Sequence, residues 1–268
     1  RLDPRDSDAR ALLSDAEFEA VKQTDLSVLV TPYIIIGIVI ALMFLVIYFY
    51  RMPKNGDQSH DINFLPTLRR IFRLDYYREG VIAQFFYVGA QIMCWTFIIQ
   101  YGTRVFMNEG MAEQDAEVLS QQFNIYAMLL FICSRFICTY LMKWLNPGFM
   151  LLLFGVLAMI LTAGVIFIDG RMGVYCLVGI SGCMSLMFPT IYGIALDGLG
   201  DDAKFGAAGL IMAILGGSVL PPLQASIIDM GKLWNMPAVN VSFLLPLVCF
   251  IIVAVYGYRM YLKTSQAK

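Results

Sequence analysis

The chain has 268 residues, of which 59% are hydrophobic and only 15% are charged, and its formal net charge is −1. Its mean hydropathy of +0.70 is far above that of soluble globular proteins. This composition excludes a soluble globular domain and predicts an integral membrane protein, and nothing in the charge indicates nucleic-acid binding.

The sequence offers no pattern for a metal centre or a cofactor. Its six cysteines fall in apolar stretches without a CxxC motif or a Cys/His cluster, and the single histidine, His60, lies in a polar loop. The chain starts at Arg1, and no basic region with a short apolar core follows it. We therefore predict no signal peptide and interpret the chain as a fragment or a processed product.

Seven apolar segments are long enough to cross a bilayer, whose core takes about 20 residues of helix to span. Segments of this length satisfy their backbone hydrogen bonds in lipid only as helices, and the absence of alternating polarity excludes a β-barrel. The sequence thus predicts an all-α membrane protein. The segments are residues 29–50, 80–104, 120–143, 148–168, 173–196, 205–228 and 241–261.

The distribution of lysine and arginine predicts how the chain is oriented. The first connection, residues 51–79, and the tail, residues 263–268, are basic, whereas the lead-in at residues 1–28 is acidic. By the positive-inside rule, the connection and the C-terminus are cytoplasmic and the lead-in is an extracytoplasmic loop.

The first connection contains a helical pattern of its own. In FLPTLRRIFRLDYYREG, residues 64–80, the apolar side chains Leu68, Ile71, Phe72 and Tyr76 recur at helical spacing, while three arginines occupy other faces. This pattern predicts a basic amphipathic helix on the inner membrane surface. It fits either a solvated connector or a linker between two halves of a larger bundle.

The odd number of segments leaves two hypotheses for the whole chain. In the first, residues 29–50 are the sixth helix of a twelve-helix transporter, 51–79 are the linker between its halves, and 80–262 form its C-terminal six-helix bundle. In the second, the chain is a seven-helix receptor for a small ligand, although its last segment offers no buried lysine for a Schiff base. A membrane enzyme is disfavoured, because no carboxylate pair, Ser/His set or group of metal ligands converges in one region.

One segment keeps polar and aromatic residues inside an apolar run. In QFFYVGAQIMCW, residues 84–95, the side chains Gln84, Tyr87, Gln91 and Trp95 are spaced three, four and four apart. At 100° per residue, this spacing places all four on one side of a helix. The segment therefore predicts a membrane helix with one polar and aromatic face.

Several longer stretches carry a family resemblance: TPY at 31–33, QFFYVGAQIMCWTFIIQYG at 84–102, SRFICTYLMKWLNP at 134–147 and MFPTIYGIALDGLGDDAKFGAAGLIMAILGGSVLPPLQ at 187–224. In this order they resemble the L-fucose:proton symporter family of the major facilitator superfamily, from the sixth helix to the end. The resemblance implies proton-coupled sugar import by alternating access across a bacterial inner membrane. L-fucose is the expected sugar, with galactose, glucose or N-acetylglucosamine as alternatives, and the N-terminal half is an absent partner.

The resemblance also bears on the proton, which would be the coupling ion. Coupling requires a group that changes charge inside the membrane, whereas the acidic residues of this chain lie near segment ends or in loops. In the family the coupling carboxylates belong to the first half. We therefore expect that this chain cannot carry the proton alone.

On this resemblance, the polar face suits a sugar. The amides of Gln84 and Gln91 both donate and accept hydrogen bonds, as sugar hydroxyls require. Trp95 can lie against the apolar face of the sugar ring, and Tyr87 can add a hydroxyl. The alternative is that these side chains only join neighbouring helices. Weaker candidates of the same kind are Asn124, Tyr192 and Gln224.

The glycines and prolines near the end of the stretch at 187–224 suggest a gate. Gly216 and Gly217 permit a close helix approach, while Pro221 and Pro222 remove backbone donors. We predict a bend or break at the prolines that helps to gate the outer entrance, with a static kink as the alternative.

A second gate is predicted on the cytoplasmic side. Arg135 lies just inside the cytoplasmic end of one apolar segment, and Asp197 lies at the corresponding end of a later one. An ion pair between them would latch this side closed, whereas simple snorkelling of Arg135 is the alternative.

Overall fold

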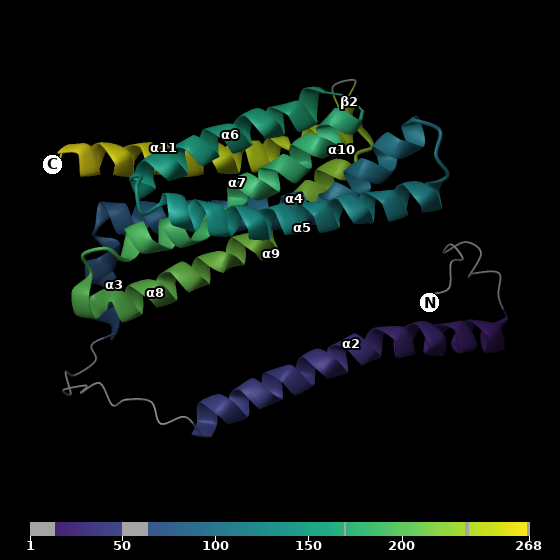
Figure 1. The fold of residues 1–268 in the computed structure, drawn as a ribbon, viewed down its shortest axis with the longest axis horizontal. Helices are drawn as coiled ribbons and strands as arrows, with labels where there is room; N and C mark the ends of the chain where they lie inside the picture. Colours follow the sequence, from purple (N-terminus) through teal and green to yellow (C-terminus); the bar gives the residue numbers. More distant parts are fainter. Residues whose placement is uncertain (1–13, 50–63, 169, 234–235, 267–268) are drawn as a thin grey trace. The chain divides into compact units, whose positions relative to one another are not determined.

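The computed structural model describes residues 14–49, 64–168, 170–233 and 236–266, and these are almost entirely helical (Figure 1). The parts of the predicted lead-in, linker and tail at 1–13, 50–63 and 267–268 lie outside the described residues. The elements are α2 (Asp15–Phe49), α3 (Phe64–Phe72), α4 (Asp75–Asn108), α5 (Glu113–Leu141), α6 (Pro147–Phe167), α7 (Arg171–Leu196), η1 (Gly200–Asp202), α8 (Ala203–Met212), η2 (Ala213–Leu215), α9 (Gly216–Ile228), β1 (Lys232–Leu233), β2 (Met236–Pro237), α10 (Ala238–Ser242) and α11 (Leu244–Gln266).

Within the described residues, seven helical stretches are long and apolar enough to cross a membrane. Each overlaps one of the seven predicted segments, so their number and helical nature are confirmed, while several bounds differ. The contacts divide the chain into two units, residues 1–62 and 63–268, and each is described by itself.

The first unit contributes the single helix α2, which begins well before the predicted segment at 29–50. The Ser14 backbone N–H and hydroxyl both donate to the Glu17 carboxylate, at 3.2 and 2.8 Å. The Glu17 carboxylate thus satisfies the backbone N–H of the residue before the helix, which is one half of a capping box. The end of the predicted lead-in loop is thus helical, because a local cap starts the helix where hydropathy gives no signal.

The second unit is a bundle of six membrane helices with α4 at its centre. α4 packs against α5, α7, α9 and α11, and α6 packs against both α7 and α11 (Figure 1). The core includes the fully buried rings of Tyr87, Tyr101, Phe106 and Phe250. Because other helices cover α4 on several sides, its polar side chains need partners inside the bundle.

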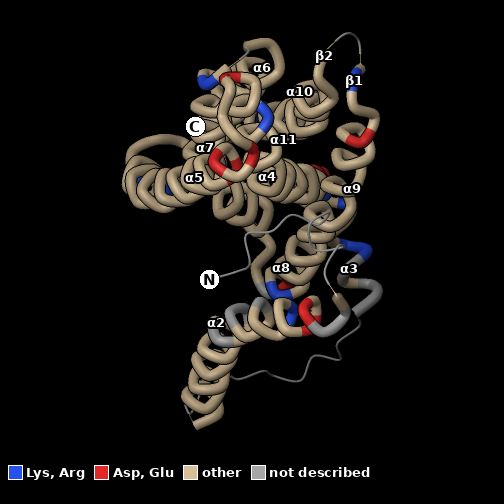
Figure 2. The backbone as a smooth tube through the Cα atoms, turned by 90° about the vertical axis from the view of Figure 1, so that its right-hand side faces the viewer, with Lys and Arg blue, Asp and Glu red and all other residues tan. Residues whose placement is uncertain are grey.

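The predicted amphipathic helix corresponds to α3, which stops at Phe72, before the end of its sequence pattern. Ile71 is fully buried in a small cluster with Tyr77, and Arg70 donates to the Asp202 carboxylate at 2.7 Å. These contacts place α3 beside α8, as Figure 2 shows. α3 is therefore docked onto the bundle and is not a free connector.

The segment predicted at 205–228 is not one continuous α-helix. α8 gives way to the 3₁₀ turn η2, and α9 then begins at Gly216. Pro221 and Pro222 lie inside α9, so the interruption precedes the prolines and the predicted position of the break is wrong.

A close crossing of α4 and α9 lies directly after this interruption. A Cβ atom on Gly216 would overlap the carbonyl oxygen of Phe85, and one on Gly217 would come within 3.1 Å of the Val88 side chain. Only residues without a side chain let the two backbones approach so closely. The close helix approach predicted for Gly216 and Gly217 is confirmed, and the 3₁₀ turn sits where the chain enters the crossing.

The last predicted segment, 241–261, begins earlier as α10 and is interrupted at Phe243 before α11 continues. Pro246 has no backbone N–H and cannot donate to the Ser242 carbonyl, which accounts for a break at this point. A short antiparallel pairing of β1 and β2 connects α9 to α10 and is a small addition to the predicted all-α fold.

Candidate functional site

The four side chains of the polar and aromatic face predicted on α4 differ in how deeply they are buried. Gln84 and Tyr87 are completely buried, with exposed fractions of 0%, whereas Gln91 and Trp95 are half-buried. Gln91 makes no hydrogen bond to another described residue, so its amide is available to a ligand. Of the four predicted side chains, the structure leaves Gln91 and Trp95 accessible.

The indole of Trp95 is held by two neighbouring helices. Its Nε1–H donates to the Ser181 hydroxyl of α7 at 3.2 Å. Its ring meets the Phe131 ring of α5 edge to face, with centroids 5.1 Å apart. These two contacts fix the ring before any ligand arrives, which lowers the entropy that binding would lose.

Arg135 belongs to the same cluster, one helical turn after Phe131. Its guanidinium carbon lies 5.5 Å from the centroid of the Phe131 ring, a cation–π geometry. Asp197 is exposed where α7 ends, and the predicted ion pair between Arg135 and Asp197 is not formed in this structure. The arginine is instead held by its contact with the Phe131 ring of α5, which also touches Trp95.

Other ion pairs join elements at the cytoplasmic side predicted from the sequence. Arg259 of α11 pairs with Glu79 of α4 at 2.9 Å, and Arg70 of α3 pairs with Asp202 after α7. Neither pair was predictable from the sequence, because no local pattern brings residues so distant in the chain together.

The two tyrosine candidates serve helix packing. The Tyr87 hydroxyl donates to the Met184 carbonyl oxygen at 2.8 Å, which joins α4 to α7. The rings of Tyr87 and Tyr192 both pack against Phe188, each with its centroid 6.3 Å away. Tyr87 therefore has the interhelical role weighed as its alternative, whereas Tyr192 stacks on Phe188 of its own helix, α7.

The two remaining polar candidates lie apart from each other. Gln224 is completely buried in α9 and donates to the Ser242 hydroxyl at 3.0 Å, which links α9 to α10. Asn124 is half-buried in α5, and its side-chain oxygen is buried without a hydrogen-bond partner among the described residues. Both side chains thus keep an unused acceptor oxygen, although the amide nitrogen of Gln224 is already paired.

A polar groove of about 620 Å³ continues along α4 from the residue after Trp95. This groove was not predicted, although Thr96, Gln100 and Thr103 recur at helical spacing and indicate a second polar stripe on α4. The groove combines neutral hydrogen-bonding side chains with acidic and basic ones. It is lined by Thr96, Ile99, Gln100, Thr103, Arg104, Met107, Asn108, Glu113, Glu117 and Val239.

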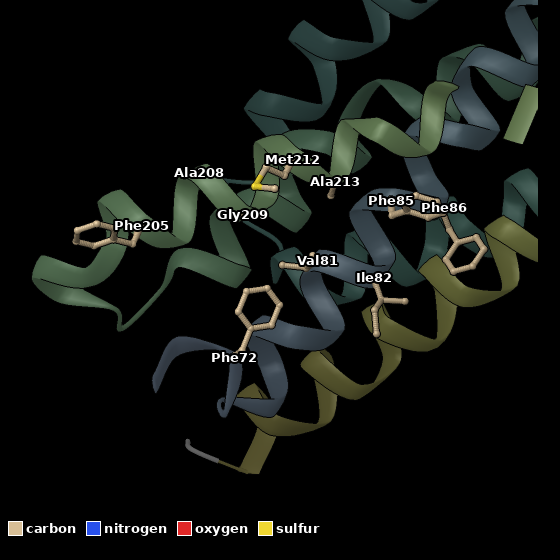
Figure 3. A pocket seen from close by; sticks show the side chains of 10 residues that line it. All are labelled: Phe72, Val81, Ile82, Phe85, Phe86, Phe205, Ala208, Gly209, Met212 and Ala213. Atoms are coloured by element: carbon tan, nitrogen blue, oxygen red, sulfur yellow. The ribbon is translucent and has the colours of Figure 1, made fainter. Parts of the chain in front are cut away.

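A second cavity, of about 430 Å³, has a different character. Figure 3 shows Phe72 of α3, side chains of α4 such as Ile82 and Phe85, and Phe205 and Met212 of α8 around it. Every lining side chain is apolar, so this cavity offers no side-chain group for the hydroxyls of a sugar.

Known proteins resemble the chain over nearly its whole length. It is 50% identical to the L-fucose-proton symporter of Haemophilus influenzae over 92% of this chain and 56% of that protein. It is 30% identical to the L-fucose-proton symporter of Escherichia coli over 91% of this chain and 54% of that protein. The chain belongs to the L-fucose:proton symporter family of the major facilitator superfamily.

The solved structures agree with this family assignment. A crystal structure of the major facilitator superfamily transporter FucP in the outward conformation superimposes with a TM-score of 0.77 and 27% identity, covering 97% of this chain and 61% of that one. No family model matches the chain.

The chain spans about half the length of the curated relatives it matches, and it corresponds to the C-terminal portion of a fucose permease. The fold is that of the sixth helix and the C-terminal six-helix bundle of such a transporter, so the chain is a multi-pass membrane protein. The relatives are transporters and not enzymes, and the comparisons give the seven-helix receptor hypothesis no support.

Proposed function

We propose that this fucose permease chain forms the C-terminal part of a twelve-helix transporter that imports L-fucose together with a proton by alternating access. Two relatives named L-fucose-proton symporters support this proposal, at 50% and 30% identity. The observation that carries it is the pairing of an accessible amide, Gln91, with a braced indole, Trp95, next to a polar groove.

These residues match the chemistry of a deoxy sugar. The Gln91 amide donates to one hydroxyl and accepts from another, and the oxygen of Asn124 supplies a second acceptor. Trp95 offers an apolar ring face to the C–H groups of the sugar. The groove after Trp95 supplies polar groups along the approach, so we assign it as the outer vestibule.

The proposed topology follows the positive-inside rule. Residues 1–28 lie outside a bacterial inner membrane, and the linker at 51–79 and the tail at 263–268 lie in the cytoplasm. The proton is carried by carboxylates of the N-terminal half, which is the partner of this bundle. Gating uses the α4–α9 crossing at Gly216 and Gly217. The backbones of the two helices are in contact there without intervening side chains, so the helices move as a pair.

The substrate is tested by uptake of labelled L-fucose into cells that express the full-length protein. Accumulation should be blocked by excess unlabelled L-fucose and persist in excess galactose, glucose or N-acetylglucosamine. Equal inhibition by galactose or glucose would move the substrate assignment to those sugars, and no accumulation despite verified expression would contradict the proposal.

We expect Arg135 to lie at the edge of the sugar site. We expect Arg135→Gln to lower L-fucose uptake about two- to fivefold, since the cation–π contact of an exposed arginine contributes about 0.5–1 kcal/mol. Asp197→Asn should leave uptake close to wild type. The measurement is initial uptake in both single variants and in the charge-swapped double variant. Recovery of activity in the double variant would instead establish the Arg135–Asp197 latch.

A further inference from the structure

The first turns of α4 and the last turns of α11 form a polar seam. The Lys263 ammonium lies 5.8 Å from the centroid of the Tyr76 ring, and one turn further in, Arg259 pairs with Glu79 at 2.9 Å. The next contact inward is made by Tyr256, whose hydroxyl oxygen lies 3.0 Å from the Cβ position of Gly80. α7 closes the same place, because the Ala195 methyl lies 2.7 Å from that position.

Polar atoms at the inner end of this seam have no protein partner. Among the described residues, no group bonds the Tyr256 hydroxyl, the second carboxylate oxygen of Glu79 or either amide atom of Gln84. Gln84 is 0% exposed, Tyr256 is 3% exposed and the Glu79 side chain is 19% exposed. Buried polar atoms are expensive to leave unpaired, and native structures pair nearly all of them with protein or with ordered water.

Helix geometry directs these side chains toward one place. Gln84 lies one helical turn after Gly80, on the face of α4 where the Cβ position of Gly80 meets the Tyr256 hydroxyl. Glu79 is the neighbour of Gly80 and faces the same helix, α11, through its ion pair with Arg259. A buried water typically makes about three hydrogen bonds to such groups.

We propose that a hydrated pocket between α4, α7 and α11 holds ordered water that bridges Gln84, Tyr256 and Glu79. The amide and the phenol donate and accept at the water, and the free oxygen of Glu79 accepts from it. This assignment replaces the sugar-binding role predicted for Gln84 and does not depend on which sugar the protein transports. It gives the cytoplasmic half of the bundle an internal solvent site that begins at the Glu79–Arg259 pair.

X-ray radiolytic labelling of the full-length protein in lipid nanodiscs tests the pocket, because hydroxyl radicals formed from bound water modify side chains beside it. Tyr77 and Tyr87 are matched controls, since both are 0% exposed and donate to backbone oxygens at 2.8 Å. Tyr256 should be modified several-fold faster than either control. Modification at the rate of the controls would overturn the proposal.

Two variants test whether Gln84 belongs to the pocket. Gln84→Leu should reduce modification of Tyr256 toward the rate of the control tyrosines, because it removes two of the groups that hold the water. Gln121→Leu, on the exposed surface of α5, should leave that rate unchanged. Fast modification of Tyr256 that persists in Gln84→Leu would overturn the bridge as assigned.

Discussion

Replacing Trp95 with alanine is expected to lower L-fucose uptake about 30-fold, since loss of a buried aromatic anchor in a binding site costs about 2 kcal/mol or more. The indole is braced by Ser181 and Phe131, so its removal takes away a ring face that was already in position. The loss should appear as a raised KM for L-fucose in initial-rate uptake.

The matched control is Trp144→Ala, because Trp144 is 77% exposed in the connection after α5. Its uptake should equal that of the wild type. Trp95→Phe should keep the aromatic face and lose only the hydrogen bond to Ser181, with an expected loss of about fivefold, or about 1 kcal/mol. An unchanged KM in Trp95→Ala at normal expression would remove Trp95 from the sugar site.

Gly216→Ala is expected to lower the free energy of unfolding by about 3 kcal/mol, at the upper end of the cost of overpacking a core. The added methyl would overlap the Phe85 carbonyl oxygen, and a backbone atom inside a packed helix cannot move aside. Gly89→Ala should cost less, about 2 kcal/mol, because its nearest contact is the flexible end of the Leu220 side chain, while the Gly216 carbonyl oxygen lies further off, at 3.2 Å.

The control for this series is Gly193→Ala, because nothing lies within 4 Å of the Gly193 Cβ position. Alanine is favoured over glycine inside a helix, so this variant should be as stable as the wild type or more stable by about 0.5–1 kcal/mol. Thermal unfolding with a thiol-reactive dye suits the comparison, since Cys94, Cys183 and Cys249 are free and buried. Equal melting temperatures for the Gly216 and Gly193 variants would rule out the close crossing.

The sequence was sufficient to predict the membrane helices, because long apolar runs in lipid leave the backbone no alternative. It did not predict where several of them begin. α4 starts at Asp75 and not at residue 80, since the charges of its first turns lower the local hydropathy while Glu79 finds Arg259 in a distant helix. α2 starts at the Ser14–Glu17 hydrogen bonds in a polar stretch, where a search for apolar runs has no signal.

The other features of the site depend on contacts between residues that are far apart in the sequence. Helical spacing correctly placed Gln84, Tyr87, Gln91 and Trp95 on one helix, but which of them α7 and α11 cover depends on how the helices assemble. Arg135 was assigned to a gate because its position along the segment is visible in the sequence. Its contact with Phe131, and through that ring its place beside Trp95, is visible only in the fold.

A pH recording tests the proposed coupling of L-fucose import to a proton. The external pH of a lightly buffered suspension of de-energised cells expressing the full-length protein is followed while L-fucose is added. L-fucose should make the medium more alkaline, whereas galactose, glucose and N-acetylglucosamine should not, and the change with L-fucose should be strongly reduced in Trp95→Ala. Labelled L-fucose that enters these cells without any pH change would contradict proton coupling and identify a uniporter.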